Sequence, residues 1–122
     1  MGQPVVHFEV IGTDGEKLQA FYSEMFDWKF NADNLQKYGI VDREENLNSE
    51  GIGIGGGVAG YAEAPNHVTF YVEVPDVEEA LSKAETLGGS KIMGPEEVAD
   101  GVQIGLFNDP EGAVIGVIKA AS

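Results

Sequence analysis

Residues 67–89 read HVTFYVEVPDVEEALSKAETLGG, and this stretch decides the fold because it predicts a strand that leads directly into a helix. The run HVTFYVEV alternates apolar and polar side chains, which is typical of a β-strand with two different faces. From Asp76 onward the apolar residues recur at helical spacing, and Asp76 with Glu79 forms a capping pair at the predicted N-terminus. Gly88 and Gly89 supply the left-handed stop that commonly ends a helix.

The same strand–helix unit occurs earlier in the chain. The sequence VVHFEVI at 5–11 alternates in the same way, and TDGEKLQAFYSEMF at 13–26 follows it. Thr13 and Glu16 form the capping pair that we predict for this helix. An apolar stripe at helical spacing should face the sheet. The stripe consists of Leu18, Phe21, Tyr22, Met25 and Phe26.

Each predicted helix is followed by shorter strand candidates, so the chain reads β-α-β-β-β twice. An internal repeat of such units packs as one structure, and 122 residues suit a single domain. We therefore predict an α+β fold for residues 1–122, with one module at about 4–60 and another at about 66–120. The strand candidates after the helices are 28–30, 38–42, 51–59, 90–93, 102–107 and 113–120.

The charge balance and the missing residue types narrow the function classes. Lys and Arg number 7 and Asp and Glu number 21, so the formal net charge is −14. Such a field repels nucleic acid and anionic membranes, and Arg43, the only arginine, leaves little material for clamping phosphates. There is no cysteine, no signal-peptide pattern and no apolar run long enough to cross a membrane. We therefore predict a cytoplasmic protein with neither nucleic acid nor a membrane as a partner.

Polar side chains share one face of each long predicted strand. His7 and Glu9 alternate with apolar residues in the first strand, and His67, Thr69 and Tyr71 do so in the second. A polar and aromatic face is typical of a lined cavity rather than of a dry core. Each residue also has a plainer interpretation, as a hydrogen-bonded histidine without chemistry or as a ring packed in the core. The predicted ligand contacts are His7, Glu9, Trp28, Tyr38, His67, Thr69, Tyr71, Gln103 and Phe107.

With these residues in place, the whole chain resembles the vicinal oxygen chelate superfamily, which groups glyoxalase I, bleomycin-resistance proteins and extradiol dioxygenases. The resemblance rests on VHFEV at 6–10, FYSEMFDW at 21–28, the stretch 67–89 and FNDPEGAVIGV at 107–117. It implies paired βαβββ modules whose mixed sheets curl around a cavity, commonly in a homodimer.

The resemblance also implies where a metal would be held, by one residue from the first strand and one from the last strand of each module. His7 falls on the first-strand position, but its counterpart in the second module is Thr69, which is a poor ligand for a divalent metal. Gly116 stands where related metal enzymes place a glutamate. A divalent site needs about three protein ligands, so we predict no metal and no other cofactor. The alternative is an improvised site of His7, His67 and Glu9.

The glycine-rich stretch GIGIGGGVAG at 51–60 matches the pattern G-x-G-x-x-G twice. A dinucleotide fingerprint, however, requires a helix directly after the glycines. Here a linker and another strand follow, and Asp76, the acid that a ribose would need, already caps a helix. We therefore predict that 51–60 holds the last strand of the first module, without a carboxylate along 54–57. The glycines are expected to leave space that admits a bulky ligand.

These observations favour a small-molecule binding protein of the bleomycin-resistance type. It would hold an aromatic or cationic natural product in the cleft of a homodimer and give antibiotic resistance by sequestration, without turnover. The alternative is a lyase- or isomerase-type enzyme of the same fold, in which His7 and Glu9 act as the catalytic acid–base pair, without metal or with a non-standard metal site. A structural or protein-interaction module is the third class, and it would lack an accessible polar and aromatic cavity.

Overall fold

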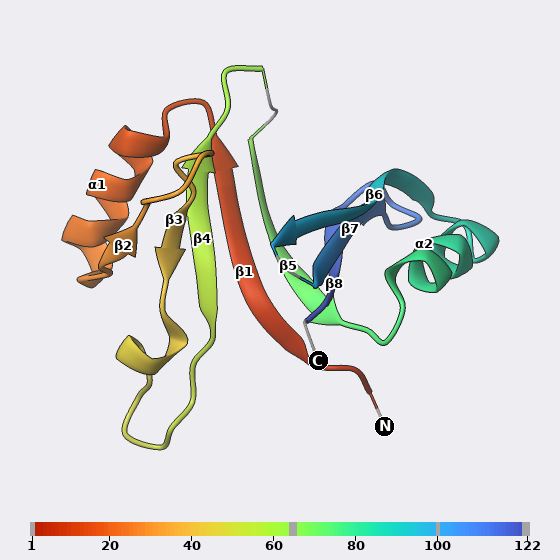
Figure 1. Cartoon of the computed structure of the whole chain (residues 1–122), viewed down its shortest axis with the longest axis horizontal. Coiled ribbons are helices and arrows are strands. Elements are labelled where there is room, and N and C mark those ends of the chain that lie inside the picture. The colour runs from red at the N-terminus through yellow and green to blue at the C-terminus, as the bar shows by residue number, and fades with distance from the viewer. Residues whose placement is uncertain (1, 64–65, 100, 121–122) are drawn as a thin grey trace. The chain divides into compact units, whose positions relative to one another are not determined.

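Two units with the same βαβββ order make up the computed structural model (Figure 1). The first unit is His7–Val68, and the second unit is Met1–Val6 together with Thr69–Ser122. This organisation confirms the predicted α+β class with two βαβββ modules. No helix in the described part of the chain is long and apolar enough to cross a membrane. The structure describes residues 2–63, 66–99 and 101–120.

The first unit is a mixed sheet with one long helix. Its elements are β1 (Val5–Gly12, which enters the unit at His7), α1 (Gly15–Phe26), β2 (Phe30–Asn31), β3 (Gly39–Val41), the 3₁₀ helix η1 (Arg43–Glu45) and β4 (Gly55–Gly60). The strand order is β2-β3-β4-β1. β1 and β4 are parallel, whereas β3 is antiparallel to both β4 and β2. The glycine-rich stretch thus supplies a strand, as predicted, and no phosphate-binding turn.

The second unit repeats this arrangement. Its elements are β5 (His67–Glu73, which enters the unit at Thr69), α2 (Val77–Thr86), β6 (Ser90–Ala99), β7 (Val102–Asn108) and β8 (Val114–Lys119). The strand order is β5-β8-β7-β6, with β5 parallel to β8 and β7 antiparallel to β8 and β6. In each unit the first strand therefore lies parallel to the fourth, which is what an internal sequence repeat should produce.

α2 forms as its sequence predicts and carries the core of the second unit. The Asp76 side chain caps the helix by accepting from the backbone N–H of Glu79 at 2.9 Å. Gly88 follows the helix with a φ of +105°, the left-handed conformation expected of the stop signal. The apolar stripe of the helix packs on the sheet. The buried cluster consists of Val74, Val77, Leu81 and Val117.

α1 departs from its prediction at its start and along its apolar stripe. Its N-cap is Asp14, whose carboxylate accepts from the backbone N–H of Lys17 at 3.1 Å, so the predicted Thr13 cap is wrong. The reason is local, because Asp14 has the extended backbone of a capping residue and the helix begins one residue later than expected. Across α1, all of which the structure describes, no residue is buried. The most exposed apolar side chains of this helix are Phe21, Met25 and Phe26.

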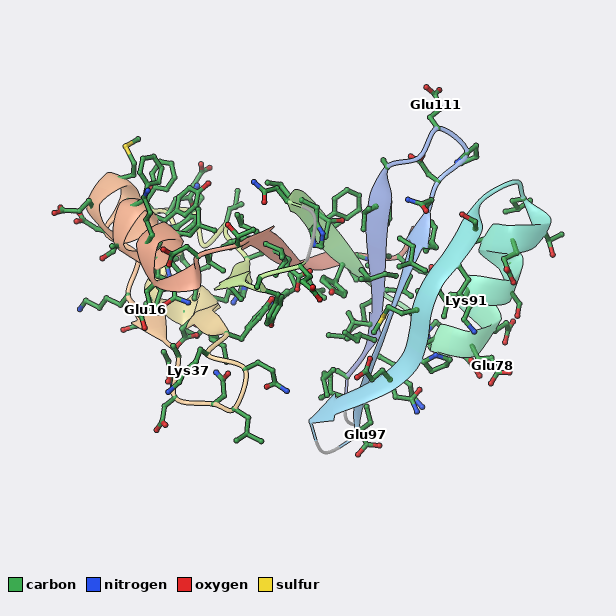
Figure 2. All side chains as sticks on the ribbon, turned by 90° about the horizontal axis from the view of Figure 1, so that it is seen from above. Glu16, Lys37, Glu78, Lys91, Glu97 and Glu111 are labelled. Atoms are coloured by element: carbon green, nitrogen blue, oxygen red, sulfur yellow. The ribbon has the colours of Figure 1, made fainter. Side chains whose placement is uncertain are left out.

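β6 is longer than the predicted strand 90–93. It continues to Ala99 and pairs with β7 through register shifts on either side of Met93. Such bulges let a strand continue through residues that break the two-residue period, so the pattern in the sequence ends early. Figure 2 shows charged side chains, among them Glu97 on this strand and Glu111, projecting away from the ribbon.

Candidate functional site

A row of hydrogen bonds joins four side chains of the first unit, all of them among the predicted ligand contacts. His7 Nε2 lies 2.9 Å from the Tyr38 hydroxyl, which donates to Glu9 Oε1 at 3.0 Å. The other carboxylate oxygen, Glu9 Oε2, lies 3.0 Å from His67 Nε2. These four residues, His7, Tyr38, Glu9 and His67, are called the His7–His67 row below.

Backbone geometry explains why these residues meet. His7 and Glu9 are two residues apart on β1, so their side chains leave the same face of the strand. Tyr38 comes directly before β3, and Asn34 holds its backbone at both ends. The Tyr38 N–H donates to Asn34 Oδ1, and Asn34 Nδ2 donates to the Tyr38 carbonyl, each at 2.8 Å. Asn34 therefore fixes the point from which the Tyr38 ring reaches over β4.

Gly57 provides the surface on which the Tyr38 ring lies. Gly57 is the register partner of Glu9 in the parallel pair of β1 and β4. A Cβ at Gly57 would overlap ring atoms and the hydroxyl of Tyr38. The phenol can therefore reach both His7 and Glu9 only because this position lacks a side chain.

Two further glycines are covered by aromatic rings in the same way. The Phe8 ring lies over Gly56, and in the second unit the Tyr71 ring lies over Gly116. At all of these positions the chain's own rings fill the space that the glycines leave. At Gly56 and Gly57 the space that we predict for a bulky ligand is therefore occupied by the rings of Phe8 and Tyr38.

Burial governs the protonation of His7. Glu9 is 7% exposed, and burial lowers the pKa of His7 below its ordinary value of 6.5, with the charge of Glu9 opposing the shift. His7 is therefore a neutral ring at pH 7, able to accept a proton. Burial, and then the charge of Glu9, raise the pKa of Tyr61, which shows that this phenol lies in the field of the same carboxylate.

The row is rich in hydrogen-bond acceptors. Glu9 contributes a buried carboxylate, which forms an ion pair with His67 when that ring is protonated. Neutral His7 contributes an imidazole with one acceptor nitrogen. Such a set suits a ligand that brings positive charge or N–H and O–H donors, since a buried carboxylate is costly unless it is paired. A neutral imidazole linked to a carboxylate can also take up a proton from a ligand.

Trp28 lies outside the row. Its ring centroid is 5.1 Å from the ring of Phe8 and 5.1 Å from that of Phe26. Phe8 leaves β1 on the face opposite to the row, because successive side chains of a strand alternate. Trp28 therefore packs on the α1 side of the sheet, which agrees with its plainer interpretation as a packed ring.

Thr69 and Tyr71 belong to the second unit and share one face of β5. Both are buried. The Thr69 hydroxyl donates to the carbonyl of Val114, and the Tyr71 ring covers β8. Val72, at the alternate position, packs against the cluster around α2. Thr69 and Tyr71 therefore face away from α2.

Gln103 and Phe107 lie on the other face of the second sheet. A Cβ at Gly105 would press on Leu81 of α2, and Phe107 packs against the cluster around α2. Because β7 alternates regularly, Gln103 shares this face. Phe107 also lines an apolar cleft of about 330 Å³ within the second unit. The contact of Gln103 and Phe107 with a ligand, which we predict from the sequence, stays a prediction.

The metal positions implied by the resemblance are not assembled into a ligand set. Among residues 2–63, 66–99 and 101–120 there is no group of three or more His, Asp or Glu side chains that could hold a metal ion. His7 and His67 each direct Nε2 to a different protein partner rather than to a common point. The improvised site of His7, His67 and Glu9 therefore does not match divalent geometry.

Three residues that shape the row have no clear signal in the sequence. Asn34 stands in an irregular segment, and its two bonds to Tyr38 depend on the path of the chain there. The sequence shows that position 57 has no side chain, but it does not predict that the Tyr38 ring occupies this space. Tyr61 follows β4, and its N–H donates to the carbonyl of Gly12 at 2.9 Å. The charge of Glu9 acts on the Tyr61 phenol, and nothing in the linker sequence indicates this interaction.

The chain belongs to the glyoxalase-like domain family, whose pattern matches residues 7–118. This match confirms the resemblance to the vicinal oxygen chelate superfamily. Solved structures of similar fold agree. A superfamily member from Vibrio splendidus 12B01, described as glyoxalase/bleomycin resistance protein/dioxygenase, is 14% identical with a TM-score of 0.64, over 98% of this chain and 100% of that one.

An epimerase also shares the fold. A variant of Streptomyces coelicolor methylmalonyl-CoA epimerase in complex with 2-nitronate-propionyl-CoA is 13% identical with a TM-score of 0.68, over 98% of this chain and 99% of that chain. At this level of identity the likeness shows the fold alone.

Curated relatives are longer proteins. "Putative glyoxylase CFP32" of Mycobacterium bovis and the protein of the same name from Mycobacterium tuberculosis are each 27% identical to this chain over 110 residues. The match covers 88% of this chain and 42% of each relative, so the chain spans less than half of their length.

Proposed function

We propose that this chain binds a small organic molecule with a positive charge or an aromatic system at the His7–His67 row, and holds it without turnover. The observation that carries the proposal is the buried carboxylate of Glu9, bonded to a hydroxyl and to an imidazole. A cationic group on the ligand would give this charge a further partner. The near-parallel rings of His7 and Tyr38, with centroids 6.2 Å apart, add surfaces suited to stacking and to cation–π contact.

Properties of the whole chain support the same proposal. A net charge of −14 attracts cations and repels anions in solution. The family fold accommodates small-molecule ligands, since the epimerase that shares it was solved with a coenzyme A compound. Sequestration of a natural product, as in bleomycin-resistance proteins, is the activity that we propose for this chain.

The test is ligand-induced stabilisation. Purified protein is screened by thermal shift against cationic glycopeptides, aromatic enediynes and simple aromatic amines, and hits are titrated by calorimetry. A ligand of the folded state should stabilise it by about 2.7 kcal/mol at about 100 times its dissociation constant. Glu9→Gln, which removes the charge at nearly constant shape, should weaken binding at least about tenfold, or about 1.4 kcal/mol.

A matched control is available on the surface of the first unit. Glu16→Gln removes the same charge from the exposed first turn of α1, where Figure 2 shows this side chain. It should leave the affinity unchanged within about twofold, because salt screens the interaction of an exposed charge with a ligand bound at the row. Equal losses in both variants would mean that the ligand senses only net charge, and binding at the row would then be excluded.

A second function is favoured by one observation, the lowered pKa of His7 together with its link to Glu9. A neutral imidazole tied to a carboxylate is suited to general base catalysis. In this alternative the chain is a lyase- or isomerase-type enzyme that removes a proton from carbon. Incubation of small carbonyl compounds in D₂O with the protein should then show exchange at the acidic C–H, followed by NMR. His7→Ala should abolish the exchange, and exchange that persists in His7→Ala would reject this alternative.

Quaternary structure and location are part of the proposal. We propose a cytoplasmic location and a homodimer. The exposed apolar side chains Phe21, Met25 and Phe26 on α1 support the homodimer, because exposed apolar patches commonly mark protein interfaces. Light scattering after gel filtration measures the mass directly. A monomer at micromolar concentration would remove the dimer from the proposal and leave ligand binding at the row untouched.

A further inference from the structure

The hydrogen atom of each contact in the His7–His67 row can be assigned to its donor. A carboxylate accepts hydrogen bonds and donates none, so the single hydrogen of the Tyr38 hydroxyl points at Glu9 Oε1. That hydroxyl can then offer only a lone pair to His7 Nε2, 2.9 Å away. The hydrogen of this contact must therefore sit on His7 Nε2. By the same rule, His67 Nε2 carries the hydrogen that it shares with Glu9.

We propose that Tyr38 is a positioning residue that holds His7 as its Nε2–H tautomer and links it to Glu9 as a proton relay. The inference deepens the proposed function, because it rests on the same site and names the ligand group that the site suits. With Nε2 donating to Tyr38, the acceptor nitrogen of neutral His7 is Nδ1. The matching ligand group is an N–H or O–H donor, such as the ammonium of a cationic ligand.

Several neighbours hold Tyr38 in this role. Its backbone is fixed by Asn34 at both N–H and C=O, and its ring lies against Gly57. Its hydroxyl lies within 3.0 Å of both partners, so a small movement of the ring would break both contacts. These restraints give the phenol little freedom to donate elsewhere.

The relay can be written with its protons in balance. A proton that reaches His7 Nδ1 allows the Nε2–H to pass its proton to the Tyr38 oxygen. The original hydroxyl proton of Tyr38 passes to Glu9 Oε1. The ring ends as the neutral Nδ1–H tautomer, the phenol is again neutral, and Glu9 is protonated. No other reactant is needed, and His67 stays bonded to the opposite oxygen of Glu9.

Several titratable groups interact with Glu9, the acceptor at the end of the relay. The groups that interact with Glu9 include Tyr38, His67, Tyr61 and His7. Burial lowers the pKa of His7, which keeps it neutral and leaves one ring nitrogen as an acceptor at pH 7.

The test uses the ligand-free protein with ¹⁵N-labelled histidine. Long-range ¹H–¹⁵N spectra near pH 7.5 should show the hydrogen of His7 on Nε2 and an acceptor-type signal at Nδ1. In Tyr38→Phe, the Nε2–H should exchange with water at least about tenfold faster, because its hydrogen-bond acceptor is gone. Gly57→Ala, which keeps the hydroxyl but displaces the ring, should give the same acceleration.

Tyr22→Phe is the matched control. Tyr22 stacks on Trp28 with ring centroids 5.8 Å apart, on the α1 side of the sheet, so its change should leave His7 exchange unaltered. A hydrogen on Nδ1 in the wild-type protein would overturn the inference, whether or not any variant folds. Equal exchange in wild type and Tyr38→Phe would overturn it as well. Neither result depends on a ligand, so failure here is distinguishable from failure of the proposed function.

Discussion

Gly57 shows how the absence of one side chain organises a site. Replacing Gly57 with Ala places a Cβ where the Tyr38 ring now lies, so the ring or the strand must move. Overpacking of this kind costs about 1–3 kcal/mol. We expect Gly57→Ala to lower the free energy of unfolding in urea by this amount.

Gly2→Ala is the control, because a Cβ at Gly2 meets nothing within 4 Å. It should leave the unfolding midpoint unchanged. If Gly57→Ala were equally harmless, the ring would not rest on Gly57 and the geometry of the row would be wrong.

His7 should make stability depend on pH. Its pKa in the folded protein is lowered below 6.5, so below that pH the unfolded chain binds more protons than the folded one. Protonation then favours unfolding, and this loss of stability is absent above the ordinary pKa. We expect the free energy of unfolding to fall from about pH 7.5 to about pH 5, and to fall less in His7→Gln. Urea titrations of both proteins across this range provide the measurement, and parallel curves would contradict the assignment.

At this scale the sequence predicts residue types better than partners. His7 and Glu9 are identified by alternation alone, since a two-residue spacing on a strand puts both on one face. The hydrogen bonds of Tyr38 with His7 and Glu9 join residues 31 and 29 positions apart in the chain. They depend on the pairing of β3 with β4. Trp28 and Tyr38 are both aromatic residues that the sequence predicts as ligand contacts, yet Trp28 packs on the opposite side of the sheet.

α2 and α1 differ in the burial of their apolar stripes. Both carry apolar stripes at helical spacing, yet Leu81 of α2 is 2% exposed and Met25 of α1 is 58% exposed. We therefore expect Leu81→Ala to cost about 2–5 kcal/mol, whereas Met25→Ala should cost less than about 0.5 kcal/mol at protein concentrations low enough to dissociate the proposed dimer. Thermal and urea unfolding of the pair measure the contrast, and similar losses in both variants would mean that α1 is covered in solution.

The start of α2 can be tested separately. Asp76→Ala removes the side-chain acceptor of the Glu79 N–H, which should cost about 1 kcal/mol. Asp76→Asn keeps an oxygen acceptor and should recover most of that loss. Circular dichroism during urea unfolding follows both, and equal stability of the two variants would reject the cap.

The sequence predicts where a helix begins only if a single residue before the helix is able to cap it. Asp76 is the sole capping residue before its helix, and the prediction for α2 is confirmed. Before α1 two adjacent residues, Thr13 and Asp14, can both cap, and the backbone conformation that selects Asp14 is not encoded in the pattern. The predicted end of β6 is wrong for a different reason. Register shifts around Met93 break the alternation on which a strand prediction depends.

At the scale of the whole molecule, the charge of −14 predicts how binding responds to salt. If the ligand is cationic, long-range attraction should be screened as the Debye length falls from about 10 Å at 0.1 M to about 3 Å at 1 M. We expect slower association and weaker affinity in high salt, measured by stopped-flow fluorescence, with little change in dissociation. A neutral aromatic ligand should lack this response, so the same titration distinguishes the two ligand classes.

The family and the two-module fold follow from the sequence because a repeat of strand, helix and three strands is a pattern over the whole chain. The activity does not follow in the same way. It depends on which side chains converge, and here Phe107 and Gln103 face α2 while Thr69 and Tyr71 face away from it. Only the paired register of strands decides such directions.

The fit of the Tyr38 ring against Gly57 has a consequence for inheritance. A larger residue at 57 and tyrosine at 38 exclude each other sterically, so the two positions should change together as the family diverges. Relatives that carry a side chain at 57 should lack the phenol at 38, and with it the bridge between His7 and Glu9. Co-variation of this pair, rather than of histidines with acids, is therefore the signature by which proteins with the same site can be recognised.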